Sequence, residues 1–211
     1  TSGAKRALER GVRHQRATPR DATRALLEKS SIQAHSHLDQ LLFRPGTILT
    51  RSGDYFQVFS QFKKNCLEHL HRGLPALAHR VKRQAPLQIS SDPIPEHVDG
   101  FEKPAQTLRD HWPAGEAEAQ ARLARFLDET IDDYHQLRDL PAKPGTSQLS
   151  TYLAAGVISP RQCLHGALAS NRGEFDSGSS GVQTWINELL WREFYKHILA
   201  GYPQVSRHRA F

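Results

Sequence analysis

The stretch TWINELLWREFYKHI, which runs from Thr184 to Ile198, carries two different sets of side chains. Turned as a helix at about 100° per residue, it gathers apolar residues on one side: Ile186, Leu189, Leu190, Phe194 and Ile198. The opposite side gathers Trp185, Glu188, Trp191, Arg192 and Tyr195. The apolar side predicts a face buried in a core. The other side predicts a bound ligand, because clustered aromatic residues on a surface usually mark an interaction site.

The chemistry within reach of this second side is the recognition of a flat, hydrogen-bonding ring such as a nucleic-acid base. Trp191 can stack on a base, and such stacking is worth about 1–3 kcal/mol per base. Glu188 lies one turn away on the same side, where its carboxylate can accept hydrogen bonds from ring N–H groups. Structural alternatives stay open for single residues: Trp185 as an apolar wall, Arg192 as the i+4 ion-pair partner of Glu188, and Tyr195 as a packing residue.

A second group of chemically useful side chains stands at the start of an expected helix over residues 149–155. Thr146, Ser147 and Ser150 bring three hydroxyls to this start, and Gly156 is expected to end the helix. A helix N-terminus has unpaired N–H groups and a partial positive charge, which attract anions. The group therefore predicts a phosphate site, with redundant capping of the helix as the alternative interpretation.

The elements that must position both groups are expected to be helices. Ser159 as N-cap, Pro160 at the first helical position and Gln162 in a capping box predict the start of one helix. Residues 115–138 predict a single amphipathic helix with an apolar stripe made of Leu123, Phe126, Leu127, Ile131 and Tyr134. The second half of the chain is thus expected to be mainly α.

The first 85 residues predict a mixed α/β segment. Arginines and alanines between Arg10 and Lys29 predict a helix that is interrupted at, or begins near, Pro19. The alternation in SIQAHSHL, residues 31–38, gives a short strand signal.

Turns, one further helix and a linker complete the expected organisation. Pro45-Gly46 and residues 52–54 predict turns. An apolar repeat that begins at Val58 predicts a helix that Gly73 ends. Repeated prolines over residues 84–113 predict a linker that holds no long helix.

The composition limits the partners and the compartment. The chain has 211 residues and a net charge of +6, which favours anionic partners. Its two cysteines, Cys66 and Cys163, lack the spacing of a metal site or a disulfide framework, so we expect a reduced, cytoplasmic setting. No apolar run is long enough to span a membrane. Because methionine is absent even from position 1, we expect an internal piece of a longer protein.

Two motifs carry a resemblance to a known family. GTSQLSTYLAAGVISPRQ followed by WINELLWREFYKHI closely resembles the flavin-binding domain of the DNA photolyase and cryptochrome family, in particular its class I cyclobutane pyrimidine dimer photolyases. PGTILTRSGDYFQVFSQFKK, residues 45–64, is similar to the junction that follows the family's antenna domain. Thr151 stands where the family often has proline. The resemblance runs collinearly over essentially the whole chain.

The resemblance implies a fold in three parts. Residues 1–83 would be the C-terminal part of a Rossmann-like α/β antenna domain with its junction helix, and residues 84–113 a long linker. Residues 114–211 would be the first part of an all-helical FAD-binding domain. The first strands of the antenna sheet and the last helices around the flavin would lie outside the chain.

The resemblance also implies light-driven DNA repair, in which reduced FAD passes an electron to a cyclobutane pyrimidine dimer flipped out of DNA. Glu188 and Trp191 would be catalytic and would contact the dimer. FAD would be held by Tyr134, Arg138, Thr146, Ser147, Gln148, Leu149, Ser150, Trp185 and Arg192. DNA would contact Glu188, Leu189, Trp191, Arg192 and Tyr195.

Further partners follow from the same resemblance, and two other functions stay open. The partner would be UV-damaged DNA, the protein a monomer, and the antenna chromophore a folate or a deazaflavin. One alternative is a cryptochrome-type photoreceptor, although signalling members often replace one or both of the residues at Glu188 and Trp191. The other is a non-enzymatic basic helical module that binds DNA.

Overall fold

The computed structural model describes residues 19–35, 37–78 and 98–207, together with positions 82, 85, 86, 90, 92, 93, 95 and 209. The chain divides into two compact units, Thr1–Leu38 and Asp39–Phe211. In the first unit, α2 spans Pro19–Lys29. This confirms a helix over these residues. The part of the prediction from Arg10 to residue 18 lies outside the described residues.

The short strand predicted over residues 31–38 is wrong where the structure describes it. Residues 32–35 and 37–38 are irregular. Among the described residues, β pairing occurs only as an isolated antiparallel bridge between Leu49 and Tyr55. A strand is stable only when a neighbouring strand pairs with its backbone, and the described residues of the first unit offer none. The α/β character expected of residues 1–83 is therefore not seen in the described part of the chain.

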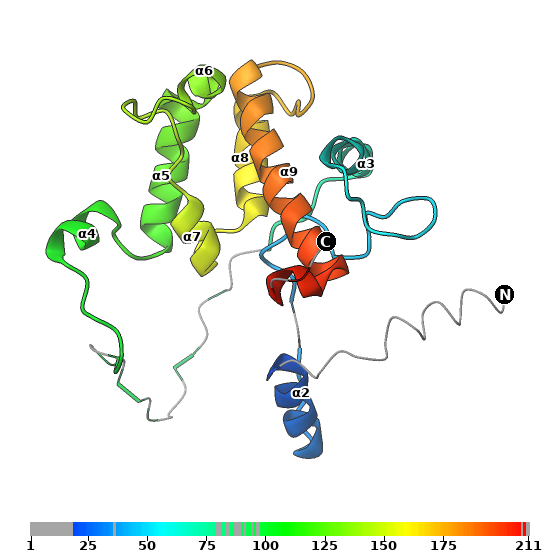
Figure 1. Cartoon of the computed structure of the whole chain (residues 1–211). Coiled ribbons are helices and arrows are strands. Elements are labelled where there is room, and N and C mark those ends of the chain that lie inside the picture. The colour runs from blue at the N-terminus through cyan, green and yellow to red at the C-terminus, as the bar shows by residue number, and fades with distance from the viewer. Residues whose placement is uncertain are drawn as a thin grey trace. The chain divides into compact units, whose positions relative to one another are not determined.

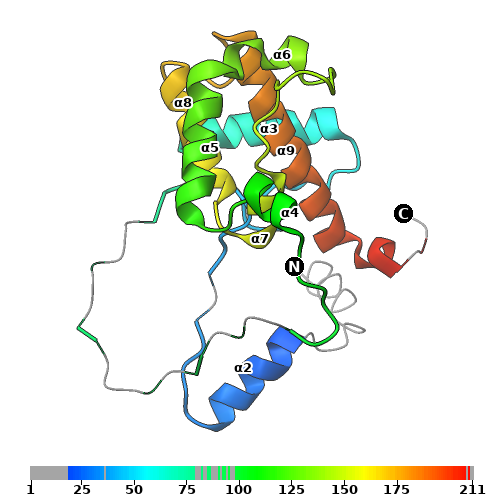
Figure 2. The same ribbon diagram turned by 90° about the vertical axis from the view of Figure 1, so that its left-hand side faces the viewer.

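Helices build the second unit (Figures 1 and 2). Their bounds are α3 Phe59–Arg72, α4 Gln106–His111, α5 Glu116–Glu129, η1 Ile131–Asp133, α6 Tyr134–Leu137, α7 Ser150–Ala155, α8 Pro160–Ser170, α9 Ser180–Gly201 and η2 Pro203–Arg207. Helix α9 is the central element, because it packs against α3, α6, α8, η1 and η2. Helix α5 reaches this core by packing against α8. No described helix combines the length and the apolar character needed to cross a membrane.

The turns and helix ends around α3 follow the predictions. Gly46 and Gly53 lie in the predicted turns with φ of 86° and 85°, a left-handed conformation that favours glycine. Helix α3 ends before Gly73, whose N–H donates to the carbonyl of Leu70. At the start of α8, the Ser159 hydroxyl accepts from the N–H of Gln162, which completes the predicted capping box.

The predicted core face of α9 is confirmed, because Ile186, Leu189, Leu190, Phe194 and Ile198 are all buried. Trp185 was predicted to lie on the opposite, ligand-facing side of this helix. This part of the prediction is wrong, because Trp185 is only 4% exposed. Its ring lies 5.0 Å from that of Phe126 on α5. Helices pack around α9 from more than one side, so its buried surface extends beyond the apolar stripe.

The single helix predicted over residues 115–138 is broken at Thr130. Helix α5 ends at Glu129, and the chain continues as η1 and then α6. The start of α9 packs directly on this break: a Cβ at Gly181 would clash with the Ile131 carbonyl. The Ser179 hydroxyl also donates to the Asp132 carboxylate at 2.5 Å. Close packing of α9 thus redirects a segment whose apolar periodicity alone fits one helix.

The predicted linker contains no long helix among its described residues, although α4 forms one short helical segment within it. The end of the linker is fixed to the helical core, because the Tyr152 hydroxyl donates to the Pro113 carbonyl at 2.8 Å. Tyr152 belongs to α7. This contact connects the linker directly to the helix that follows the hydroxyl-rich residues.

Candidate functional site

Three of the predicted site residues meet where α6 crosses α9. The Arg138 guanidinium donates to the Glu188 carboxylate over 2.6 Å between Nη1 and Oε1. The same guanidinium carbon lies 5.6 Å from the centre of the Tyr134 ring. The hydrogen bond to Glu188 raises the pKa of Arg138, and burial raises the pKa of Tyr134. The break at Thr130 makes this meeting possible, because it turns α6 towards α9.

Glu188 and Arg192 do not pair with each other, contrary to the i+4 alternative. Arg192 instead donates through Nη1 to the Gln40 carbonyl at 2.7 Å. The ion-pair partner of Glu188 comes from a segment 50 residues earlier in the chain. A helical repeat within α9 cannot indicate such a partner.

An aromatic cluster surrounds Trp191, and it consists of Phe59, Trp191, Phe194 and Tyr195. The rings of Phe59 and Trp191 are stacked, with centroids 3.5 Å apart and an interplanar angle of 9°. Tyr195 lies 5.7 Å from Trp191 and is 59% exposed. One face of the half-buried Trp191 ring is therefore covered by α3, and the exposed part of the cluster lies on the side of Tyr195.

Phe59 is a site neighbour that the sequence pattern did not predict. Its position in the apolar repeat of α3 predicts only a core residue. Its stacking partner lies on α9, more than 130 residues later. Leu189, expected to contact DNA, is 5% exposed and belongs to the core; its DNA contact stays a prediction.

The residues Thr146 to Ser150, which we call the hydroxyl loop, cross over α5 and lead into α7. Leu149 occupies the N-cap position, and no side-chain cap hydrogen bond forms there. The structure therefore does not support redundant capping as the role of the loop's hydroxyls. Gln148 has a φ of 51°, which is uncommon for a residue with a side chain.

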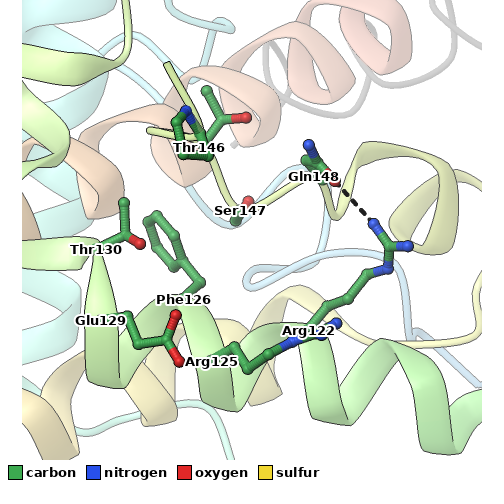
Figure 3. Close-up of a pocket in the computed structure, with 9 residues that line it drawn as sticks. Arg122, Arg125, Phe126, Glu129, Thr130, Thr146, Ser147 and Gln148 are labelled. Carbon is green, nitrogen blue, oxygen red and sulfur yellow. Dashed lines mark hydrogen bonds between the residues drawn. The ribbon is translucent and has the colours of Figure 1, made fainter. Parts of the chain in front are cut away.

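Three residues of the hydroxyl loop, Thr146, Ser147 and Gln148, line a hollow of about 340 Å³. Figure 3 shows Thr146, Ser147 and Gln148 of the loop facing residues of α5 across this hollow. The lining from α5 and its end consists of Arg122, Arg125, Phe126, Glu129 and Thr130. Arg122 donates to the side-chain oxygen of Gln148 at 2.8 Å, the contact drawn in Figure 3. Hydroxyls and guanidinium groups, which can both bind anions, thus meet at one place, together with the carboxylate of Glu129.

Glu193 and His197 are buried polar residues that were not among the predicted site residues. Glu193 is fully buried, and its two carboxylate oxygens accept from the backbone N–H groups of Leu42 and Phe43 at 3.0 and 2.9 Å. His197, only 2% exposed, places Nε2 3.4 Å from Oε1 of Glu193. Both residues fall within the apolar stripe of α9, and polar residues in such a stripe are the signal that could have indicated them.

Comparisons with known proteins bear on the identity of these residues. The family model described as DNA photolyase matches residues 7–82. The deoxyribodipyrimidine photo-lyase of Escherichia coli (strain K12) is 37% identical over 174 residues, which cover 82% of this chain and 36% of that protein. The deoxyribodipyrimidine photo-lyase of Neurospora crassa is 32% identical over 185 residues, which cover 82% of this chain and 30% of that protein.

Solved structures agree with these sequence matches. The structure of a bacterial class III photolyase from Agrobacterium tumefaciens aligns with a TM-score of 0.64 at 29% identity, over 90% of this chain and 40% of that one. The cryptochrome of Synechocystis sp. PCC6803 aligns with a TM-score of 0.57 at 20% identity, a likeness of fold alone. The chain spans less than half the length of each of these proteins. It belongs to the DNA photolyase family.

Proposed function

We propose that this chain is part of a light-driven DNA repair enzyme that splits cyclobutane pyrimidine dimers, and that it belongs to class I of its family. The observation that carries the proposal is the face of α9, where Glu188 is held by Arg138 and Trp191 lies three residues later. A carboxylate and an aromatic ring at this spacing suit a flipped pyrimidine pair, which needs both hydrogen bonds and stacking. The matches to photo-lyases over about four fifths of the chain support the same function.

The hydroxyl loop fits the phosphates of FAD. Its hydroxyls stand beside a helix start that has no side-chain cap, and two arginines line the same hollow. We propose that Thr146, Ser147 and Ser150 donate through their hydroxyls, and that Gln148 and Leu149 contribute backbone N–H groups. When bound, FAD would supply the light-driven electron.

Other residues would enclose the cofactor. Tyr134 and Arg138 would flank it, Trp185 would form an apolar wall, and Arg192 would lie at the border of the cofactor and DNA sites. The hydrogen bond from Arg192 to the Gln40 carbonyl would hold the guanidinium at this border.

On the DNA side, Glu188 would orient the dimer and Trp191 would stack on it. Phe59 covers one face of Trp191, so the indole is held in place before DNA arrives. Tyr195, which is largely exposed, would complete the rim of this pocket. The side chain of Leu189 is buried and would support this face from within the core.

Replacing Thr146 and Ser150 with alanine in the full-length protein should weaken FAD retention by about 5- to 10-fold per residue. Each change removes one hydrogen bond to a charged phosphate, worth about 1 kcal/mol or somewhat more. Flavin absorbance per protein after gel filtration measures the effect. Ser170→Ala, which removes a hydroxyl bonded within α8, is the matched control. Unchanged flavin occupancy would show that these two hydroxyls do not bind the cofactor.

Trp191→Ala should weaken binding to dimer-containing DNA, by about 1–3 kcal/mol for the lost stacking. Binding to undamaged DNA should change little, because backbone phosphates supply most non-specific affinity. Fluorescence anisotropy with matched damaged and undamaged duplexes measures both. Trp191→Phe keeps a ring beside Phe59 and should recover part of the loss. An equal loss on both duplexes would make Trp191 a structural residue.

Repair of a dimer-containing oligonucleotide under blue light tests the proposed function. Loss of dimers that depends on both light and protein is the expected result. A bound flavin without repair would indicate a cryptochrome-type photoreceptor. DNA binding without any flavin absorbance would indicate a non-enzymatic helical module.

Two further measurements use the same purified protein. Its absorption spectrum would reveal an antenna chromophore, either folate or deazaflavin. Size-exclusion chromatography would test the expected monomer.

A further inference from the structure

Arg122 connects three separate segments of the helical unit. From α5, its Nε donates to Glu118 at 2.7 Å, and its Nη1 donates to Gln148 of the hydroxyl loop at 2.8 Å. Its Nη2 donates to the carbonyl of His111, at the end of α4, at 2.5 Å. The side chain is only 12% exposed. All three guanidinium nitrogens are therefore engaged by fixed partners.

The ring contacts of Arg122 extend the same connection. Its guanidinium carbon lies 4.9 Å from the centre of the Trp112 ring and 5.6 Å from that of Tyr152. Tyr152 belongs to α7, directly after the hydroxyl loop, and its hydroxyl holds the Pro113 carbonyl. Arg122 is thus enclosed between the end of the linker and the helix that the loop begins.

The contact with Gln148 matters because of the backbone at that residue. Gln148 has a positive φ of 51°, a conformation that residues with side chains seldom adopt without support. Its side chain is bonded to Arg122, which supplies that support. Gln148 lies between Ser147 and Leu149, so its conformation decides how the Thr146 and Ser147 hydroxyls stand relative to Ser150.

We propose that Arg122 is the positioning residue of the hydroxyl loop, and that it presets the loop for the phosphates of FAD through Gln148. This inference rests on the proposed function. Arg122 acts through its planar fork of donors: it is paired with Glu118, and each of its three guanidinium nitrogens donates one hydrogen bond to a protein acceptor. A lysine at this position would keep the charge but could not reach all three acceptors.

A double-mutant cycle in the full-length protein tests the proposal. Arg122→Gln and Gln148→Ala should each raise the FAD dissociation constant on the order of fivefold, and the double variant should be no weaker than Arg122→Gln alone. Arg122→Lys should behave like Arg122→Gln. Gln120→Ala, which removes an exposed bond within α5, should leave FAD affinity unchanged. Fluorescence titrations are made at a temperature where circular dichroism shows every variant folded.

A second measurement reports how well the hydroxyl loop is ordered in the absence of FAD. Hydrogen exchange of the amides at 147–151 in the cofactor-free protein should be faster in Arg122→Gln than in the unmodified protein. Full recovery of FAD affinity by lysine would show that Arg122 acts as a charge, and additive losses in the double variant would show that it does not act through Gln148; either result overturns the proposal. Failure of the unmodified protein to bind FAD would overturn the proposed function, and the exchange rates would then decide alone whether Arg122 holds the loop.

Discussion

Glu193→Ala is expected to lower the free energy of unfolding of the full-length protein by about 3 kcal/mol. The carboxylate accepts from two buried backbone N–H groups, those of Leu42 and Phe43. Each of these groups would lose its partner, and an unpaired buried donor costs about 1–3 kcal/mol. Water cannot easily replace the carboxylate, because Glu193 is completely buried. Urea unfolding followed by circular dichroism measures the change.

Two variants make this expectation specific. Glu193→Gln keeps one oxygen acceptor and should lose roughly half as much stability as the alanine variant. Glu68→Ala removes an exposed carboxylate of α3 and should change the unfolding free energy by less than about 0.5 kcal/mol. An alanine variant at position 193 that unfolds at the same urea concentration as the unmodified protein would show that the two N–H groups find other partners.

Glu188→Gln is expected to lower the yield of repair per absorbed photon by about tenfold, while affinity for damaged DNA falls only modestly. An amide at position 188 cannot form the ion pair with Arg138, so the hydrogen bond that holds this side chain beside the proposed dimer site would lose its charge assistance. Losing a charge-assisted hydrogen bond costs about 1.5–3 kcal/mol. About 1.4 kcal/mol is a factor of ten in rate. Cleavage of the bonds of the dimer would then be slower than the return of the electron, and the yield would fall.

Flash photolysis at saturating damaged DNA measures this yield separately from binding. Glu68→Gln makes the same chemical change at an exposed site on α3 and should leave the yield unaltered. A yield in Glu188→Gln equal to that of the unmodified protein would contradict a role of the Glu188 charge in the proposed reaction.

The sequence predicted the parts of the fold that depend on neighbouring residues. The capping box at Ser159, the helix over Pro19–Lys29 and the apolar stripe of α9 all rest on local spacing, and all are confirmed. The break at Thr130 was not predicted, because its cause is the packing of Gly181 from a distant helix. The strand signal near Ile32 failed for the opposite reason, since no described neighbour in its unit pairs with it.

The candidate site divides in the same way. The face of α9 and the hydroxyl loop could be predicted because their residues lie close together in the sequence. The partners of these residues could not, because Arg138 reaches Glu188 and Phe59 reaches Trp191 from other elements. Arg122 was also missed, since an arginine on an amphipathic helix ordinarily faces solvent.

The hydrogen bonds from Leu42 and Phe43 to Glu193 join two segments that are synthesised at very different times during translation. Leu42 and its acceptor are separated by 151 positions, so nearly the whole helical unit is synthesised before this bond can form. Contacts between such distant residues form slowly, because a long loop must close first. Nascent chains released before α9 would keep two donors of the 42–43 segment without an acceptor. Such truncated chains should be recognised by chaperones and proteases, and full-length chains should escape both once α9 has docked.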